Sequence, residues 1–293
     1  MKKKAIFRGT ATALITPFRD GEIDYPALYS LIDMQIDAEI DALVIGGTTA
    51  EAATLDTDER YTLYEKCAEY IDGRTKLIFG TGTNDTRCAV RHTKRAEAIG
   101  CDGVLVVTPY YNKGTEEGVV RHYLTIAEAS QTPVILYNVP ARTGVNLSIP
   151  QLERFAEHPM IAAVKEASDS LDRLFAISAL GDKLALYSGN DSQIYPTLAL
   201  GGLGVISVIS NLIPCQTRAI TELYFRGSIA ESRLANLKLL PLINAMFKET
   251  NPSPIKYAMS KLGYCLPELR LPLAEPSEKT CAFIDKALTE YGL

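Results

Sequence analysis

The sequence has few of the residues that build metal centres, and their spacing does not suit that purpose. Its three histidines show no metal-ligand spacing, and its six cysteines include no Cys-x-x-Cys pair. We therefore expect no metal site and no cofactor held by one, and we interpret the cysteines as free thiols in a reducing compartment. The residues concerned are His92, His122, His158, Cys67, Cys88, Cys101, Cys215, Cys265 and Cys281.

A long hydrophobic run and an excess of positive charge are also missing. No segment reaches the ~18 uninterrupted apolar residues that a membrane helix needs. Residues 1–4 have the basic start of a signal peptide, but Phe7-Arg8-Gly9 interrupts any apolar run after them. The formal net charge of −5 gives no basic footprint for nucleic acid. We therefore expect a cytoplasmic protein that binds neither membranes nor nucleic acid.

What is present is the composition of an ordinary globular protein. Of the 293 residues, 47% are hydrophobic and 22% are charged. A chain of this length buries roughly three quarters of its unfolded surface, which is enough for one large domain, alone or with an appendage.

Short apolar runs alternate with amphipathic stretches along most of the chain. Eight runs indicate strands, and helical patterns with capping signals follow them. Eight such units in about 225 residues match an α/β fold of the (β/α)8 TIM barrel type. A doubly wound open sheet is the alternative that counting leaves open. The predicted strands are 11–16, 42–46, 76–80, 104–107, 134–138, 161–165, 184–188 and 205–208; the predicted helices are 25–38, 58–71, 85–99, 117–130, 150–158, 171–180, 193–200 and 214–225.

After residue 225 the strand pattern stops. Three helical patterns follow, over 231–247, 254–262 and 278–291, separated by proline and glycine. We therefore predict a barrel domain over residues 1–226, which holds the catalytic site, and a small C-terminal helical domain over residues 227–293.

Lys165 stands where a lysine is seldom found. The four apolar residues before it indicate a strand buried on both faces, so Lys165 lies at the carboxyl end of a buried strand. Because desolvation penalises an ammonium, such a lysine is either paired or shifted toward its neutral, nucleophilic form. A Schiff-base lysine needs the second environment. Pairing with Glu166 or another acid is the alternative that this stretch leaves open.

Small and hydroxyl residues follow the second strand, at the barrel end where active sites of this fold are built. In Gly46–Glu51, the glycines let a ligand approach the backbone, and Thr48 and Thr49 offer hydroxyls and amides. Such a cradle would suit a carboxylate, although a plain tight turn explains the same residues.

Tyrosines follow two neighbouring strands. Tyr110 and Tyr111 come after the fourth strand, and Tyr137 is at the end of the fifth. A phenol there can pass a proton to a bound carbonyl or amine, and with Thr48 these tyrosines would form a relay. Taken singly, each tyrosine is more typical of a rim residue with its hydroxyl in water. Arg142 has a planar fork that suits a substrate carboxylate, or else a surface ion pair.

The remaining polar positions have structural interpretations. Either Asn84 or Asp85 is predicted to cap the helix after the third strand, and Asp191 is predicted to cap a helix rather than act as a catalytic acid. Asn251 is predicted to tie the C-terminal helices to the barrel. The backbones of Gly189 and Ile206 could face a ligand.

These segments, in this order, resemble the dihydrodipicolinate synthase and N-acetylneuraminate lyase superfamily, and within it the dihydrodipicolinate synthase family. The resemblance runs essentially from end to end. The motifs that carry it are Gly47-Thr48-Thr49-Ala50-Glu51, Thr108-Pro109-Tyr110-Tyr111-Asn112-Lys113, Tyr137-Asn138-Val139-Pro140, Arg142-Thr143-Gly144, Val164-Lys165-Glu166, Gly189-Asn190-Asp191, Gly204-Val205-Ile206-Ser207-Val208, and Asn251-Pro252 with Lys256.

The resemblance implies a lyase that condenses pyruvate with L-aspartate 4-semialdehyde toward diaminopimelate and lysine, as a homotetramer of tight dimers. Lys165 would form the Schiff base with pyruvate, and no other cofactor would be needed. Tyr137, Thr48 and Tyr111 would relay protons, with Tyr111 reaching across the tight-dimer interface. Substrate binding would fall to Thr49, Arg142, Ile206 and Gly189.

Two departures from the family pattern concern the early motif, where Ala50 and Ala52 replace a glycine and a serine. We expect the backbone at Ala50 to avoid φ > 0. In feedback-inhibited relatives, a serine, a histidine and a glutamate hold lysine, and the matching positions here are Ala52, Arg60 and Cys88. At these positions the positively charged lysine would find no carboxylate and would face the positive charge of Arg60. We therefore predict weak or absent inhibition by lysine.

Two other functions share parts of the pattern. An aldolase for N-acetylneuraminate or a 2-keto-3-deoxy sugar acid would use the same lysine and tyrosine, but such lyases tend to lack an arginine at the position of Arg142. A non-catalytic pyruvate-binding barrel would have no use for a proton relay.

Overall fold

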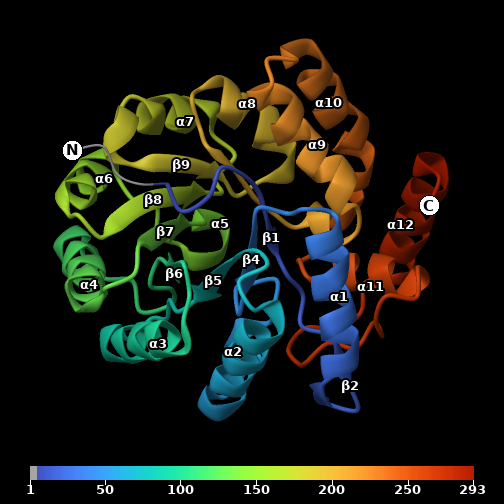
Figure 1. Ribbon diagram of the computed structural model, residues 1–293, viewed down its shortest axis with the longest axis horizontal. Helices are drawn as coiled ribbons and strands as arrows, with labels where there is room; N and C mark the ends of the chain where they lie inside the picture. Colours follow the sequence, from blue (N-terminus) through green and yellow to red (C-terminus); the bar gives the residue numbers. More distant parts are fainter. Residues whose placement is uncertain (1–4) are drawn as a thin grey trace.

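Residues 5–293 are described by a computed structural model, and the basic start at residues 1–4 lies outside the described residues. Within that range, parallel strands close into a barrel in the order β1-β10-β9-β8-β7-β6-β5-β4 (Figure 1). The ring closes because β1 pairs with β10 on one side and with β4 on the other. The predicted (β/α)8 barrel is confirmed, and the open-sheet alternative is wrong. The strands are β1 (Gly9–Ala13), β4 (Ala42–Ile45), β5 (Lys76–Gly80), β6 (Gly103–Val107), β7 (Val134–Asn138), β8 (Ile161–Glu166), β9 (Ala185–Ser188) and β10 (Gly204–Ser207).

Helices in the connections surround the barrel (Figure 1). Side chains fix several of their first turns: Asp85 accepts a hydrogen bond from the amide of Arg87, as predicted, and Ser148 forms a capping box with Gln151. The helices around the barrel are α1 (Tyr25–Asp37), α2 (Thr57–Ile71), α3 (Thr86–Ile99), α4 (Glu116–Ala129), α6 (Ile149–Glu157), α7 (Leu171–Ser178), α8 (Ile194–Ala199) and α9 (Pro214–Phe225).

Short elements are the ones that the sequence pattern did not predict. They are too brief to display a period, because each spans four residues or fewer. They are the hairpin of β2 (Phe18–Arg19) and β3 (Glu22–Ile23), the single helical turn α5 (Pro140–Thr143), and the 3₁₀ turns η1 (Ala52–Thr54), η2 (Gly181–Lys183), η3 (Asp191–Gln193) and η4 (Ile209–Asn211).

The hydrophobic core has two layers. The larger one lies between the strands and the helices. The smaller one fills the barrel interior with side chains such as Ala42, Ile78 and Ile135. At one end of this interior Phe7 stacks on Tyr187, with 4.3 Å between ring centroids. Apolar side chains therefore close the barrel interior, and polar chemistry is left to the carboxyl ends of the strands.

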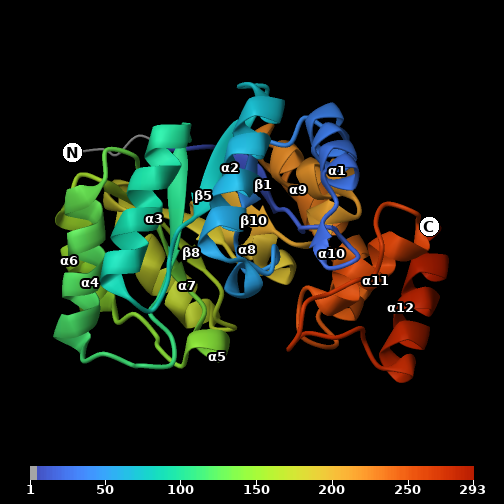
Figure 2. The same ribbon diagram turned by 90° about the horizontal axis from the view of Figure 1, so that it is seen from below.

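The chain continues past the barrel with α10 (Ile229–Met246), α11 (Ser253–Lys261) and α12 (Glu278–Tyr291). All three were predicted as helices. Figure 2 shows α11 and α12 at the opposite end of the molecule from α4 and α6. The turn from α9 into α10 falls at Gly227, whose φ is 88°, and the domain boundary placed there stays a prediction. Among residues 5–293, we find no helix that combines the length and the apolar character needed to span a membrane.

Candidate active site

Lys165 lies near the carboxyl end of β8, between Tyr137 of β7 and Tyr187 of β9 in the sheet register. Its side chain is 5% exposed. Burial lowers the pKa of its ammonium to about 7; the carboxylate of Asp191 opposes this shift, and the charge of Arg142 adds to it. Much of Lys165 is therefore neutral near pH 7, and its lone pair is available for attack on a carbonyl.

A change in strand pairing sets the direction in which Lys165 points. Ile161 pairs with Val134, but Ala163 pairs with Ile135, so β8 carries one extra residue at this place. As a result, Ile161 packs in the layer under the helices, while Ala163 packs in the barrel interior. Because side chains alternate along a strand, Lys165 shares the inward direction of Ala163.

The ring of Tyr137 lies against the Lys165 ammonium, with 4.3 Å from Nζ to the ring centroid. Burial raises the pKa of the Tyr137 phenol, and Arg142 and Thr48 oppose the rise. A phenol that keeps its proton near pH 7 can both donate and accept a hydrogen bond. Tyr137 is thus suited to exchanging protons with a group bound to Lys165.

The turn after β4 presents two free backbone N–H groups. The amides of Ala50 and Glu51 donate to carbonyls earlier in the turn, whereas those of Thr48 and Thr49 have no acceptor within residues 5–293. Adjacent N–H groups of this kind form a concave site for an anion. Ala50 avoids positive φ, as expected, and the non-glycine residue of the turn with a positive φ is Glu51, at 56°.

Asn251 ties the start of α11 to this turn. Its Nδ2 donates to Oγ1 of Thr49 over 2.9 Å, and its carbonyl accepts a hydrogen bond from Nη2 of Arg142 over 2.9 Å. The predicted tie is confirmed. The Oδ1 atom of Asn251 is buried and has no partner in the described part of the chain. The C-terminal helices therefore help to fix both the anion cradle and the arginine.

A cavity of about 480 Å³ opens over these groups. Thr48, Tyr137, Arg142 and Asn251 all line it. Lys165 is not part of its wall and lies against the ring of Tyr137. A cavity of this size accommodates small carboxylic acids, and the arrangement offers them a nucleophile, a proton carrier, an anion cradle and a guanidinium.

Comparisons with known proteins agree with this geometry. The sequence profile of the dihydrodipicolinate synthetase family matches residues 6–291. The chain belongs to this family.

Individual relatives match over nearly the whole chain. A 4-hydroxy-tetrahydrodipicolinate synthase of Geotalea uraniireducens is 44% identical over 289 residues, which cover 98% of this chain and 100% of the relative. The crystal structure of dihydrodipicolinate synthase from Thermotoga maritima has a TM-score of 0.96 at 41% identity, covering 98% of this chain and 99% of that one. A chloride-inhibited dihydrodipicolinate synthase from Acinetobacter baumannii, complexed with pyruvate, has a TM-score of 0.95 at 38% identity, covering 97% and 99%.

Within one chain of this family member, Tyr111 does not reach the cavity. Its side chain is 90% exposed, and its backbone has a φ of 68°. Its neighbour Tyr110 lines the cavity instead. The role of Tyr111 in a relay therefore depends on a second copy of the chain.

Gly189 and Ile206 do not line the cavity either. The amide of Gly189 donates to the carbonyl of Glu166 over 2.6 Å, so this N–H is not free for a ligand. A Cβ at Gly189 would lie 2.6 Å from the Cβ of Ala167, which explains the glycine by close packing. Ile206 is fully buried in the barrel interior. Their predicted substrate contacts stay untested.

Asp191 differs from the prediction. It is 2% exposed, and its Oδ2 accepts hydrogen bonds from the amides of Val208 and Ile209, at the start of η4. It therefore caps a turn after the next strand rather than its own helix. Sequence reasoning missed its electrostatic effect on Lys165, which arises because β8 and β9 pair side by side and bring their carboxyl ends together.

The cavity extends toward Ala52 and Arg60, two of the positions that the sequence resemblance assigns to lysine binding. Arg60 and Ala52 line this end, and Nη2 of Arg60 donates to the Ala52 carbonyl over 2.5 Å. His92, which the sequence did not single out, also lines it; burial and nearby arginines lower the pKa of its imidazole to about 4. Cys88 is not in the wall and contacts Asp85.

Among residues 5–293, no three His, Cys, Asp or Glu side chains lie together in a way that could hold a metal ion.

Proposed function

We propose that the chain is a 4-hydroxy-tetrahydrodipicolinate synthase that condenses pyruvate with L-aspartate 4-semialdehyde through a Schiff base on Lys165. The observation that carries this proposal is a buried lysine with a pKa of about 7, held against a buried tyrosine beneath an anion-binding turn. The membership of the chain in the family, with relatives of that name over its whole length, supports the same reaction.

The first half of the reaction takes place on Lys165. Neutral Nζ attacks the keto carbon of pyruvate, and loss of water gives an iminium. The amides of Thr48 and Thr49 hold the pyruvate carboxylate. The iminium withdraws electrons, so a methyl proton leaves and an enamine forms. Tyr137 supplies and removes the protons in these steps, with the Thr48 hydroxyl next in the relay.

The second half joins the two substrates. Arg142 binds the carboxylate of aspartate semialdehyde through its guanidinium, and the enamine carbon attacks the aldehyde, whose oxygen becomes a hydroxyl. The amine of the second substrate then attacks the imine carbon. This closes the ring and expels Lys165 as the free amine. The product contains all atoms of the two substrates except those of the one water lost when the iminium forms. The reaction therefore needs no oxidant or reductant.

The proposal extends to assembly and location. Tyr111 completes the relay from a neighbouring chain, which calls for a tight dimer, and we place two such dimers in a homotetramer in the cytoplasm. A largely exposed tyrosine in a left-handed backbone conformation supports the dimer, because a neighbouring chain would cover it.

Intact-mass spectrometry after borohydride reduction in the presence of pyruvate tests the proposal. The wild type should gain one reduced pyruvate, Lys165→Ala should gain none, and the wild type should turn over aspartate semialdehyde. An adduct without such turnover would indicate a sugar-acid aldolase, to be tested with N-acetylneuraminate. No adduct in the wild type would refute the Schiff-base function.

A further inference from the structure

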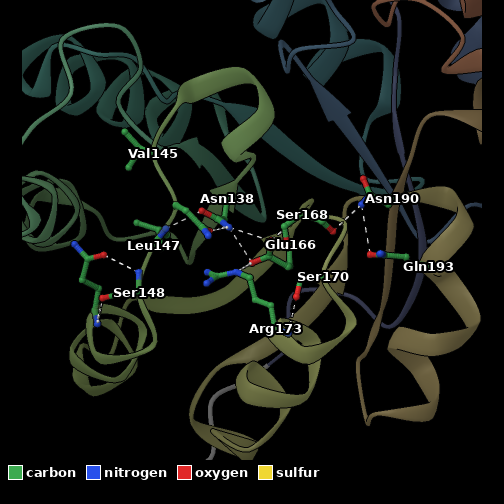
Figure 3. Close-up of polar contacts among 12 residues, drawn as sticks. Asn138, Val145, Leu147, Ser148, Glu166, Ser168, Ser170, Arg173, Asn190 and Gln193 are labelled. Carbon is green, nitrogen blue, oxygen red and sulfur yellow. Dashed lines mark hydrogen bonds and ion pairs between the residues drawn. The ribbon is translucent and has the colours of Figure 1, made fainter.

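A buried hydrogen-bond network lies behind the two residues that carry the chemistry. Glu166 follows Lys165 on β8, and Asn138 follows Tyr137 on β7. In the sheet, Tyr137 lies beside Lys165 and Asn138 lies beside Glu166. Because side chains alternate along a strand, Lys165 and Tyr137 point into the barrel, and Glu166 and Asn138 point out toward the helices. Figure 3 shows Glu166 and Asn138 side by side, with Arg173 reaching them from α7.

Glu166 is the centre of this network. Its side chain is 0% exposed. Its carboxylate accepts hydrogen bonds from Nε of Arg173 over 2.8 Å, from Nδ2 of Asn138 over 3.0 Å, and from the amide of Ser168 over 2.8 Å. A buried carboxylate is costly unless its oxygens are filled in this way. The pairing of Lys165 with Glu166 that the sequence left open is therefore wrong, because Arg173 takes that place.

Asn138 carries the network on to the loop after α5. Its Oδ1 accepts a hydrogen bond from the amide of Leu147 over 3.0 Å, and its Nδ2 donates to Oδ1 of Asn146 over 2.9 Å. This loop leads from α5, which contains Arg142, into α6 (Figure 3). On the other side of the network, the amide of Gly189, the residue after β9, donates a hydrogen bond to the Glu166 carbonyl.

We propose that Arg173, Glu166 and Asn138 form a brace that positions Lys165, Tyr137 and the Arg142 loop for the reaction. The inference rests on the proposed function. The three are positioning residues, since Glu166 and Asn138 point away from the barrel interior and Arg173 meets them from the helix layer. The brace joins the segments that carry the nucleophile, the proton carrier and the arginine. A displacement of about 1 Å at such groups can lower a rate about 100-fold, so their common support has a direct effect on turnover.

Four variants separate this role from a purely structural one. Arg173→Met removes the charge partner of Glu166, and Arg173→Lys keeps the charge but loses the planar fork. Ile177→Ala removes a fully buried side chain from the same helix without touching the network. Arg154→Met breaks a largely exposed ion pair with Glu117 on neighbouring helices. Thermal melting ranks the stability of all four, and borohydride trapping counts the sites that still form the pyruvate adduct.

The brace predicts a loss of turnover per competent site. In Arg173→Met, kcat per trappable site should fall about 10- to 100-fold and KM for aspartate semialdehyde should rise, and Arg173→Lys should recover part of both. Ile177→Ala should lose trappable sites or melting temperature but keep kcat per site within about twofold, and Arg154→Met should match the wild type. Equal kcat per site in Arg173→Met and the wild type, or an equal loss in Ile177→Ala, would overturn the inference.

Asn146→Ala gives a milder test in case Arg173→Met does not fold. Asn146 is exposed, and the substitution removes only the outer link of the brace. KM for aspartate semialdehyde should rise several-fold while KM for pyruvate is unchanged; an unchanged KM for both would count against the brace. A wild type that traps no pyruvate would instead refute the proposed function, so the two failures are distinguishable.

Discussion

At the scale of single residues, the chemistry of Lys165 is set by its surroundings. Burial lowers its pKa to about 7, and the Asp191 carboxylate limits that shift. The two effects have opposite signs, and burial is the larger one. A fully exposed lysine would be almost entirely charged at neutral pH, so the same residue at the surface would be a poor nucleophile.

The pH dependence of pyruvate binding follows from these signs. In the wild type, kcat/KM for pyruvate should rise with pH through about 7, because only the neutral amine attacks. Asp191→Asn removes the charge that favours the ammonium but keeps an acceptor for the amides of Val208 and Ile209. In this variant the pKa of Lys165 should be lower, so the rise of kcat/KM for pyruvate should occur at lower pH. Rate profiles with both enzymes test this, and a move to higher pH would contradict the assigned role of Asp191.

Arg60 gives a second prediction at this scale. Its guanidinium lines the end of the cavity that the motif resemblance assigns to lysine binding, and Cys88, which the resemblance places at a glutamate position, is outside the wall. A cationic effector would meet a like charge and no acid partner. Turnover should be insensitive to L-lysine up to millimolar concentrations. Half-inhibition well below one millimolar, measured at saturating pyruvate, would show the prediction to be wrong.

At the scale of elements, the turn after β4 is held by the C-terminal helices. Nζ of Lys256 on α11 lies 2.7 Å from Oε1 of Glu51, and both side chains are 0% exposed. The other carboxylate oxygen of Glu51 accepts the amide hydrogen bond of Arg270 over 3.0 Å. Glu51 needs this support, because it adopts the left-handed conformation that few residues other than glycine prefer.

Breaking this ion pair should be costly. Lys256→Met leaves the Glu51 charge buried without its partner, and we expect the free energy of unfolding to fall by about 3–5 kcal/mol. Lys261→Met is the matched control on the same helix: Lys261 is 48% exposed and pairs weakly with Asp285 over 3.5 Å, so its loss should cost less than about 1 kcal/mol. Urea denaturation at fixed chain concentration measures both. Equal effects would mean that the buried pair does not hold the turn.

At the scale of the whole molecule, the proposed function requires a neighbouring chain to supply Tyr111, because this side chain is 90% exposed and does not line the cavity of its own chain. Under that proposal each site is built from two chains. Neither a Lys165→Ala chain nor a Tyr111→Phe chain alone would then build an intact site.

Mixing two inactive variants tests this arrangement. In a dimer of one Lys165→Ala chain and one Tyr111→Phe chain, one site carries both substitutions and the other carries neither. Coexpression should therefore restore activity well above that of either variant alone, up to about half of the wild type per mixed dimer. Activity that stays at the sum of the two single variants would show that Tyr111 does not cross an interface.

The sequence by itself determined the order of the elements and the barrel ends at which the functional groups lie. Buried strands and amphipathic helices have distinct periods, and polar residues stand out against apolar runs, so Lys165, Tyr137, Thr48 and Arg142 could be predicted as candidate site residues from their positions. The motif resemblance added their roles. The short hairpin and the 3₁₀ turns were missed because a period cannot be recognised in two to four residues.

Only the tertiary structure decided how these groups face one another. The extra residue in β8 turns Lys165 toward the barrel interior, and it arises from pairing with β7, which no local pattern records. The charge of Asp191 acts on Lys165 because β8 and β9 lie side by side, and Arg173 of α7 pairs with Glu166 of β8. Such pairings depend on how strands and helices pack in three dimensions, and the energy of burying a charge depends on everything packed around it.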